Sequence, residues 1–169
     1  MDWILAILLF LHVLGAIVAF GPSFAFALMG PMAAAEPMHM NYTLRLQKKI
    51  ASTLITPLAL VQGVTGLLIV WRISAISGVG FVDVLTQGWL LLAIVLYITA
   101  LAISFGLIYP NLRILLAGTS GPPPAPSAGG APVGPPPHIM AAARRIRMAS
   151  MSTLVLIVSI VFLMVTKPF

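Results

Sequence analysis

The chain has 169 residues, of which 60% are hydrophobic and 7% are charged, and its mean hydropathy is +1.11. These values exclude a soluble domain of ordinary composition and indicate an integral membrane protein. The net charge is +6, but the basic residues lie at the ends of apolar runs, so we expect no nucleic-acid partner. Because the chain has no cysteine, a disulfide, a thiolate metal site and a cysteine nucleophile are excluded.

The first apolar run covers residues 3–29 and is long enough to cross about 30 Å of hydrocarbon as a helix. Asp2 stands where a secretory signal carries positive charge, and the run is longer than the apolar core of such signals. We therefore expect a retained span. Pro22 predicts a kink in it, because the carbonyl of Val18 loses its backbone donor.

Three further apolar runs complete four spans within a single transmembrane domain. They cover residues 50–71, 89–109 and 146–165. Trp3, Trp71 and Trp89 fall at one predicted edge of the membrane, where indole rings prefer the lipid–water interface. Pro57 predicts a second kink. The expected fold is all-α: a polytopic membrane protein with four transmembrane helices in an antiparallel bundle.

The distribution of basic residues predicts the orientation of the bundle. Three lie between the first and second spans and four between the third and fourth, whereas the other side has only Arg72 and Lys167. The positive-inside rule then places both termini outside, in a bacterial inner membrane. The proline-rich segment 117–137 becomes an extended cytoplasmic linker, since proline supplies no backbone donor. The alternative is a proline-rich ligand for an SH3-like or WW-like partner.

One polar side chain in each span lies at nearly the same predicted depth. Counting inward from the outer edge at about 1.5 Å per residue places these side chains about 13 Å deep. They are His12, Gln62, Thr99 and Ser159. We interpret them as a hydrogen-bonded layer that either joins the helices or forms a haem, quinone or proton site at His12. The other two histidines lie in predicted cytoplasmic loops, which disfavours bis-histidine haem within one chain.

A second candidate metal site is the segment Met38, His39 and Met40. Soft thioethers together with imidazole suit Cu(I), whereas the alternative is that these methionines fill space at a membrane edge or partner surface. Enzyme signatures are otherwise missing. The three carboxylates lie outside the predicted hydrocarbon region and far apart in sequence, so we expect no enzyme.

Two features favour helix packing and lipid contact. The cluster Arg144, Arg145 and Arg147 at the start of the fourth span is expected to hold anionic lipid headgroups. Small residues at three- or four-residue spacing allow helices to approach closely. These pairs are Gly15 with Ala19, Gly63 with Gly66, and Ala102 with Gly106.

Three stretches carry a resemblance to a known family: LHVLGAIVAFG in the first span, the basic patch from Arg45 to Lys49, and TPLALVQGVTGLL in the second span. They resemble a bacterial family of four-helix integral membrane proteins that is defined as a domain of unknown function. More remotely, the early histidine is similar to that of haem-b protoporphyrinogen oxidases and CopD-type copper-resistance membrane proteins. That resemblance implies haem b ligation by His12, although Thr99 stands where the third span lacks a histidine.

Taken together, these patterns favour a structural or accessory subunit of a larger membrane complex, in respiratory or photosynthetic electron transport. Its expected partners are membrane lipids and other membrane subunits or a second copy of the chain, and we expect no cofactor. The first alternative is a haem-b redox protein that uses His12. The second is a copper-handling protein that uses Met38, His39 and Met40.

Overall fold

The computed structural model describes residues 2–121 and 135–167, and all regular secondary structure in these ranges is helical. Two of the long helical segments contain a π-helical turn. The elements, in chain order, are α1 (Trp3–Ala35), α2 (Pro37–Ile50), η1 (Ala51–Ile55), α3 (Thr56–Ser77), α4 (Phe81–Leu85), α5 (Gly88–Ile103), η2 (Ser104–Ile108), α6 (Tyr109–Gly118) and α7 (Pro137–Thr166).

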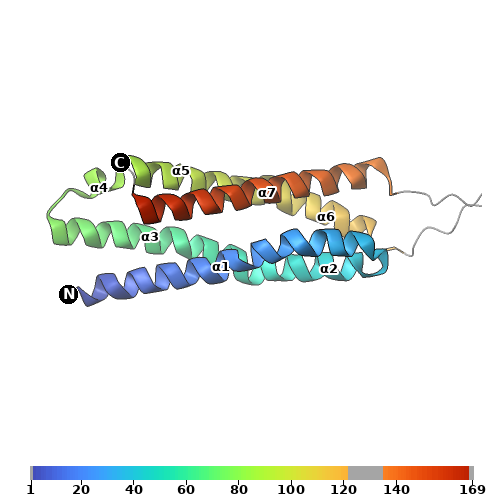
Figure 1. Cartoon of the computed structure of the whole chain (residues 1–169), viewed down its shortest axis with the longest axis horizontal. Helices are drawn as coiled ribbons and strands as arrows, with labels where there is room; N and C mark the ends of the chain where they lie inside the picture. Colours follow the sequence, from blue (N-terminus) through green and yellow to red (C-terminus); the bar gives the residue numbers. More distant parts are fainter. Residues whose placement is uncertain (1, 122–134, 168–169) are drawn as a thin grey trace, which may run out of the picture.

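Four helical segments are long and apolar enough to cross a membrane, which confirms the predicted all-α membrane architecture. They form an elongated antiparallel bundle in which α1 packs along α3 and α5 packs along α7 (Figure 1). Contacts of α1 with α7 and of α2 with α6 join the two pairs. Both chain ends lie at one end of the bundle, as predicted (Figure 1). We call this the terminal end and the opposite one the basic end.

The helices extend beyond the predicted spans at the basic end. Helix α1 has 33 residues and is therefore about 50 Å long, although about 30 Å suffices to cross the hydrocarbon. The stretch before residue 50 that was expected to be a loop is helical, because α2 begins at Pro37, where proline is well tolerated, and continues directly into η1. Hydropathy detects only the part of a helix that lipid surrounds, so it missed this extension.

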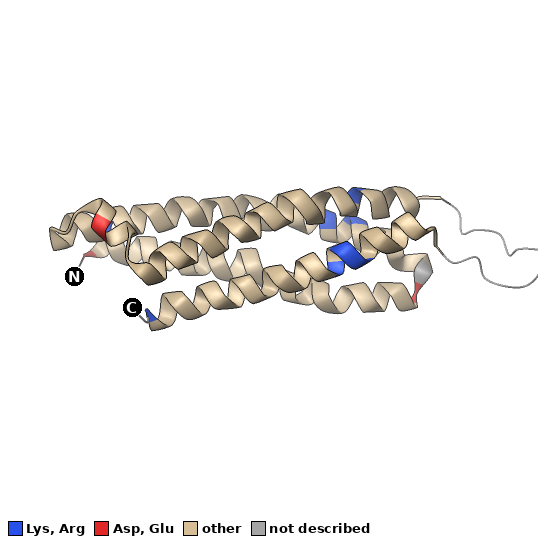
Figure 2. Cartoon of the chain, turned by 90° about the horizontal axis from the view of Figure 1, so that it is seen from above, with Lys and Arg blue, Asp and Glu red and all other residues tan. Residues whose placement is uncertain are grey.

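Seven basic residues form a belt around the bundle, and none lies in the part of the helices between the belt and the terminal end (Figure 2). The belt consists of Arg45, Lys48, Lys49, Arg113, Arg144, Arg145 and Arg147. It lies about 20 residues from the tryptophans of the terminal end, which is the length needed to cross the hydrocarbon. This spacing matches the prediction that the belt lies at the second membrane surface, which remains a prediction.

A hydrophobic cluster holds the helices together at the belt and beyond it. Its buried members are Leu44, Leu112, Leu115, Ile139 and Ala142, from α2, α6 and α7. Apolar burial stabilises this part of the bundle because water surrounds it. Within the membrane, where lipid is as apolar as leucine, helix packing depends instead on close approach and hydrogen bonds.

The two π-helical turns lie near the level of the belt, and each is followed by proline as the second residue of the next helix. Pro57 follows η1 and Pro110 follows η2. The kink predicted at Pro57 falls directly after η1, and the kink predicted at Pro22 falls inside α1, which is a continuous helix from Trp3 to Ala35. Both kinks remain predictions. The side chains just before the two prolines meet, since Thr56 Oγ1 lies 2.6 Å from Tyr109 Oη. This contact joins the second and third spans where both helices change their winding.

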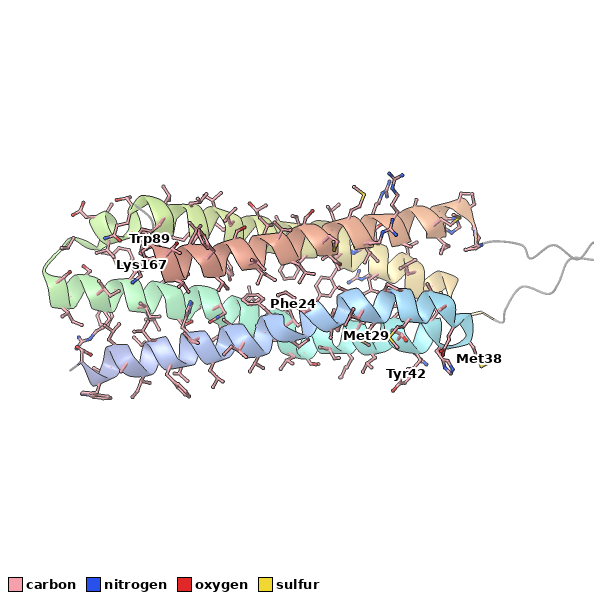
Figure 3. The ribbon with its side chains drawn as sticks, in the orientation of Figure 1. Phe24, Met29, Met38, Tyr42, Trp89 and Lys167 are labelled. Atoms are coloured by element: carbon pink, nitrogen blue, oxygen red, sulfur yellow. The ribbon has the colours of Figure 1, made fainter. Side chains whose placement is uncertain are left out.

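Ionic and aromatic contacts join neighbouring helices at the terminal end. Asp2 caps α1 by accepting a hydrogen bond from the backbone N–H of Leu5, and it also pairs with Arg72 of α3 at 2.5 Å. The Arg72 guanidinium lowers the pKa of the Asp2 carboxyl below its usual value. At the end of α7, the Lys167 ammonium lies 5.6 Å from the centre of the Trp89 ring (Figure 3).

The proline-rich linker is shorter than predicted. Helix α6 continues to Gly118 and α7 begins at Pro137, so residues 117, 118 and 137 are helical. Residues 122–134, on which most of the linker prediction falls, lie outside the described residues.

Candidate functional site

The polar residues of the first two spans meet between α1 and α3. His12 Nδ1 lies 2.7 Å from the Thr65 hydroxyl oxygen, and Gln62 Nε2 donates to the backbone carbonyl of His12 at 2.8 Å. The Thr65 oxygen also lies 3.4 Å from Gln62 Oε1. Gln62 is buried and His12 is half-buried, so these groups satisfy one another where lipid cannot.

Glycines make this close approach of α1 and α3 feasible. A Cβ atom on Gly15 would lie 3.2 Å from Gln62 Oε1, and one on Gly66 would lie 3.4 Å from His12 Cε1. Each polar side chain therefore rests against a glycine of the opposite helix. The predicted small-residue pairs Gly15 with Ala19 and Gly63 with Gly66 thus face the interior of the bundle.

The third span reaches the same region through Tyr97. Its hydroxyl donates to the Ala59 carbonyl of α3 at 2.8 Å. A Cβ atom on Gly63 would lie only 2.8 Å from that hydroxyl oxygen. We call His12, Gln62, Thr65 and Tyr97 the polar junction.

The predicted polar layer is only partly present. His12 and Gln62 meet as expected, but the hydroxyls of Thr99 and Ser159 donate to carbonyls one turn back in their own helices, at 2.8 and 2.9 Å. Among the described residues, neither has a hydrogen bond to His12 or Gln62. The predicted depth does not specify the direction in which a helical side chain points.

Two residues of the polar junction, Thr65 and Tyr97, were not predicted from the sequence. Thr65 follows Gln62 by three residues, and such positions share one face of a helix. Tyr97 lies eight residues inward from Trp89, so the depth count that selected Thr99 also covers it. Both signals were present in the sequence and could have identified these residues.

The structure does not bring the predicted copper ligands together. Met38 is exposed at the tip of the basic end (Figure 3), whereas Met40 packs against the hydrophobic cluster. Two residues apart on a helix, they point in different directions. His39 instead lies 3.8 Å from the Glu36 carboxylate on the surface. The described ranges contain no cluster of three or more His, Asp or Glu side chains that could hold a metal ion.

The predicted lipid-binding cluster lies in the belt. Arg144, Arg145 and Arg147 are exposed on α7, and none of them forms an ion pair within the part of the chain that the structure describes. This position is compatible with headgroup contact, which remains a prediction.

The comparisons with known proteins agree with this architecture. The model of the family described as "Predicted integral membrane protein (DUF2269)" matches residues 6–168. The chain belongs to this family. No curated protein and no solved structure matches it, so the remote resemblance of this DUF2269 protein to haem-b oxidases and CopD-type proteins stays a prediction.

The chemistry available to this DUF2269 protein at the polar junction is limited to hydrogen bonding and the ring nitrogens of His12. The carboxylates Asp2, Glu36 and Asp83 lie at the two ends of the bundle (Figure 2). Because no acid lies beside the imidazole, the junction lacks a carboxylate–histidine pair for proton transfer. Its hydrogen bonds join α1 to α3 and α5 to α3.

Proposed function

We propose that this protein is an accessory subunit of a larger membrane complex and binds a partner helix through the Ala102–Gly106 face of its third span. The observation that supports this is the outward position of the motif. Both residues are exposed, and a Cβ atom on Gly106 would meet nothing within 4 Å. Of the three small-residue pairs named from the sequence, the other two pack inside the chain, and this one faces outward.

The neighbouring residues strengthen the proposal. Gly106 lies in the π-helical turn η2, and such turns are frequent at functional sites. The exposed ring of Phe105 beside it offers an apolar anchor for a partner. Helices associate in lipid by close backbone approach, which an open glycine permits and a large side chain prevents.

The setting of the complex is part of the proposal. The seven-residue basic belt supports a bacterial inner membrane with the basic end in the cytoplasm and both termini outside, by the positive-inside rule. We place the complex in respiratory or photosynthetic electron transport. The scarcity of catalytic groups supports an accessory rather than an enzymatic role.

Native electrophoresis in mild detergent tests the proposal. The wild-type chain is expected to migrate in a larger complex, and Gly106→Ile is expected to release it. The matched control is Gly21→Ile, because Gly21 lies at similar depth in α1 and a Cβ atom on it would also meet nothing within 4 Å. A wild-type chain that always migrates alone, or a Gly106→Ile variant that stays in the complex, would refute the proposal.

A second candidate function is haem binding by His12, which one observation favours. Thr65 Oγ1 also lies 3.0 Å from the carbonyl of Val61, its natural acceptor. When Thr65 donates its proton to the Val61 carbonyl, its oxygen can only accept from His12, so His12 Nδ1 carries the proton and donates to Thr65. This hydrogen bond orients the imidazole ring and leaves the lone pair of Nε2 free to bind a metal. The residues fit a single imidazole ligand, because His39 and His138 lie beyond the belt in the first turns of α2 and α7.

Absorption spectroscopy separates this candidate from the first. A reduced-minus-oxidised difference spectrum of the purified protein is expected to show a haem b signal that His12→Ala removes. A colourless protein that still enters the larger complex would refute haem binding while leaving the accessory role intact.

A further inference from the structure

A groove of about 450 Å³ lies between α2, the start of η1 and α6, away from both the polar junction and the Ala102–Gly106 face. Its lining combines positive charge with neutral polar groups. The lining residues are Asn41, Arg45, Lys48, Lys49, Ser52, Leu116 and Ser120.

The three cations of the groove lack a negative partner in the described part of the chain. Arg45, Lys48 and Lys49 are exposed, and none of them forms an ion pair there. The one carboxylate at this end, Glu36, lies within 4 Å of His39 instead. Three uncompensated positive charges on one and a half turns of helix produce a local field that attracts an anion.

The other polar groups hold the walls of the groove in position. Asn41 Nδ2 donates to the Leu116 carbonyl at 3.4 Å and to the Thr119 hydroxyl at 3.0 Å, which joins α2 to α6. The Ser52 hydroxyl donates to the Lys49 carbonyl at 3.2 Å. The groove thus lies beside the point where Asn41 joins α2 to the end of α6.

The depth of the groove matches the headgroup layer of the bilayer. The second span is predicted to begin at residue 50, so Arg45, Lys48 and Lys49 lie within about 8 Å of the predicted edge of the hydrocarbon. The headgroup region on each side of a bilayer is about 5 to 8 Å thick, so these cations lie at the level of lipid phosphates. Lipid phosphates are concentrated at this level of the membrane, whereas a soluble anion is not.

We propose that this groove binds the phosphate headgroup of an anionic phospholipid, with Arg45, Lys48 and Lys49 as its ligands. Basic pockets between membrane helices are a known way to hold such headgroups. The site differs from the arginine cluster of α7, which is exposed on a single helix and does not line the groove. A lipid bound here would link α2 to α6 just beyond the two π-helical turns.

Native mass spectrometry of the full chain in detergent micelles tests the site, with phosphatidylglycerol and phosphatidylcholine as probes. One phosphatidylglycerol is expected to bind at least about tenfold more tightly than phosphatidylcholine. The triple variant R45Q/K48Q/K49Q is expected to lose that preference. The variant R113Q removes a positive charge from the same belt but outside the groove, and it is expected to keep that preference.

Two additional arms make the result decisive. The variant K48R/K49R keeps the charge and is expected to bind like the wild type, which shows that the positive charge, and not the lysine side chain itself, holds the lipid. Inorganic phosphate added at millimolar concentration is expected not to displace the lipid. An equal loss of the preference in R113Q, equal binding of both lipids, or displacement by phosphate would each overturn the proposal.

Discussion

The contact between Gly63 and Tyr97 leads to a quantitative prediction about how the third span is held. The Tyr97 hydroxyl donates to the Ala59 carbonyl at 2.8 Å, and its oxygen lies 2.8 Å from the position of a Cβ atom on Gly63. The next nearest ring atoms, Cε1 and Cζ, are 3.4 Å from that position. Gly63→Ala must therefore displace the hydroxyl and break its hydrogen bond, whereas a phenylalanine ring at position 97 would tolerate the methyl group.

The expected size of the effect follows from these contacts. An interhelical hydrogen bond in a membrane contributes about 0.6 to 2 kcal/mol, so Tyr97→Phe should lower the free energy of unfolding by about 1 kcal/mol. Gly63→Ala gains about 1 kcal/mol of helix propensity but loses the same hydrogen bond, so it should be nearly neutral in the wild type. In the Tyr97→Phe background there is no hydroxyl hydrogen bond to lose, so Gly63→Ala should raise the free energy of unfolding through its helix propensity alone. The two substitutions should therefore couple by about 1 kcal/mol.

The assay is a double-mutant cycle on reversible unfolding in mixed micelles, with helical circular dichroism as the signal. Gly106→Ala serves as the control, because a Cβ atom at this position would meet nothing within 4 Å. Its effect on the free energy of unfolding should be the same with tyrosine or phenylalanine at position 97. Equal effects of Gly63→Ala in the two backgrounds would show that the hydroxyl contact does not join α5 to α3, and would refute the prediction.

Three further predictions use the same unfolding measurement. Gln62→Met should lower the free energy of unfolding by about 1 kcal/mol, because it removes the hydrogen bond to the His12 carbonyl; no change would show that this bond contributes nothing. Asn111→Leu should raise the free energy of unfolding by about 1 kcal/mol, because the gain from removing the buried Asn111 Oδ1, which has no partner among the described residues, exceeds the loss of the 2.7 Å bond from Nδ2 to the Leu107 carbonyl; a lower free energy of unfolding would contradict this prediction. Since Arg72 lowers the pKa of Asp2 from 3.8, their pair should stabilise the protein above that pH and lose its effect as the pH falls below it. Asp2→Asn should remove this part of the pH dependence, and an unchanged profile would contradict the assignment.

The transmembrane architecture could be predicted from the sequence because lipid imposes simple rules. Backbone groups in hydrocarbon must bond within their own helix, so four long apolar runs require four helices. An even number of spans places both termini at one end, as observed. The same rules do not apply beyond the headgroups, so the helical extension past the basic belt was not foreseen.

The polar junction shows the limit of reasoning by depth. His12 and Gln62 were expected to share one level, and they do meet in the structure. Thr99 lies at a similar depth but faces outward, while Tyr97, two residues earlier, reaches α3. A change of two residues shifts the depth by about 3 Å but turns the side chain by about 200°, so depth alone could not choose between them.

The sequence by itself determined the number of spans and the relative position of the termini, because these depend on hydropathy along one axis. Only the tertiary structure decided which faces meet. It placed Thr65 beside His12, closed the Gly63–Gly66 surface against its neighbours and left Ala102 and Gly106 open. The physical reason is that the rotation of each helix is decided by packing with its neighbours, which the sequence of a single span does not contain.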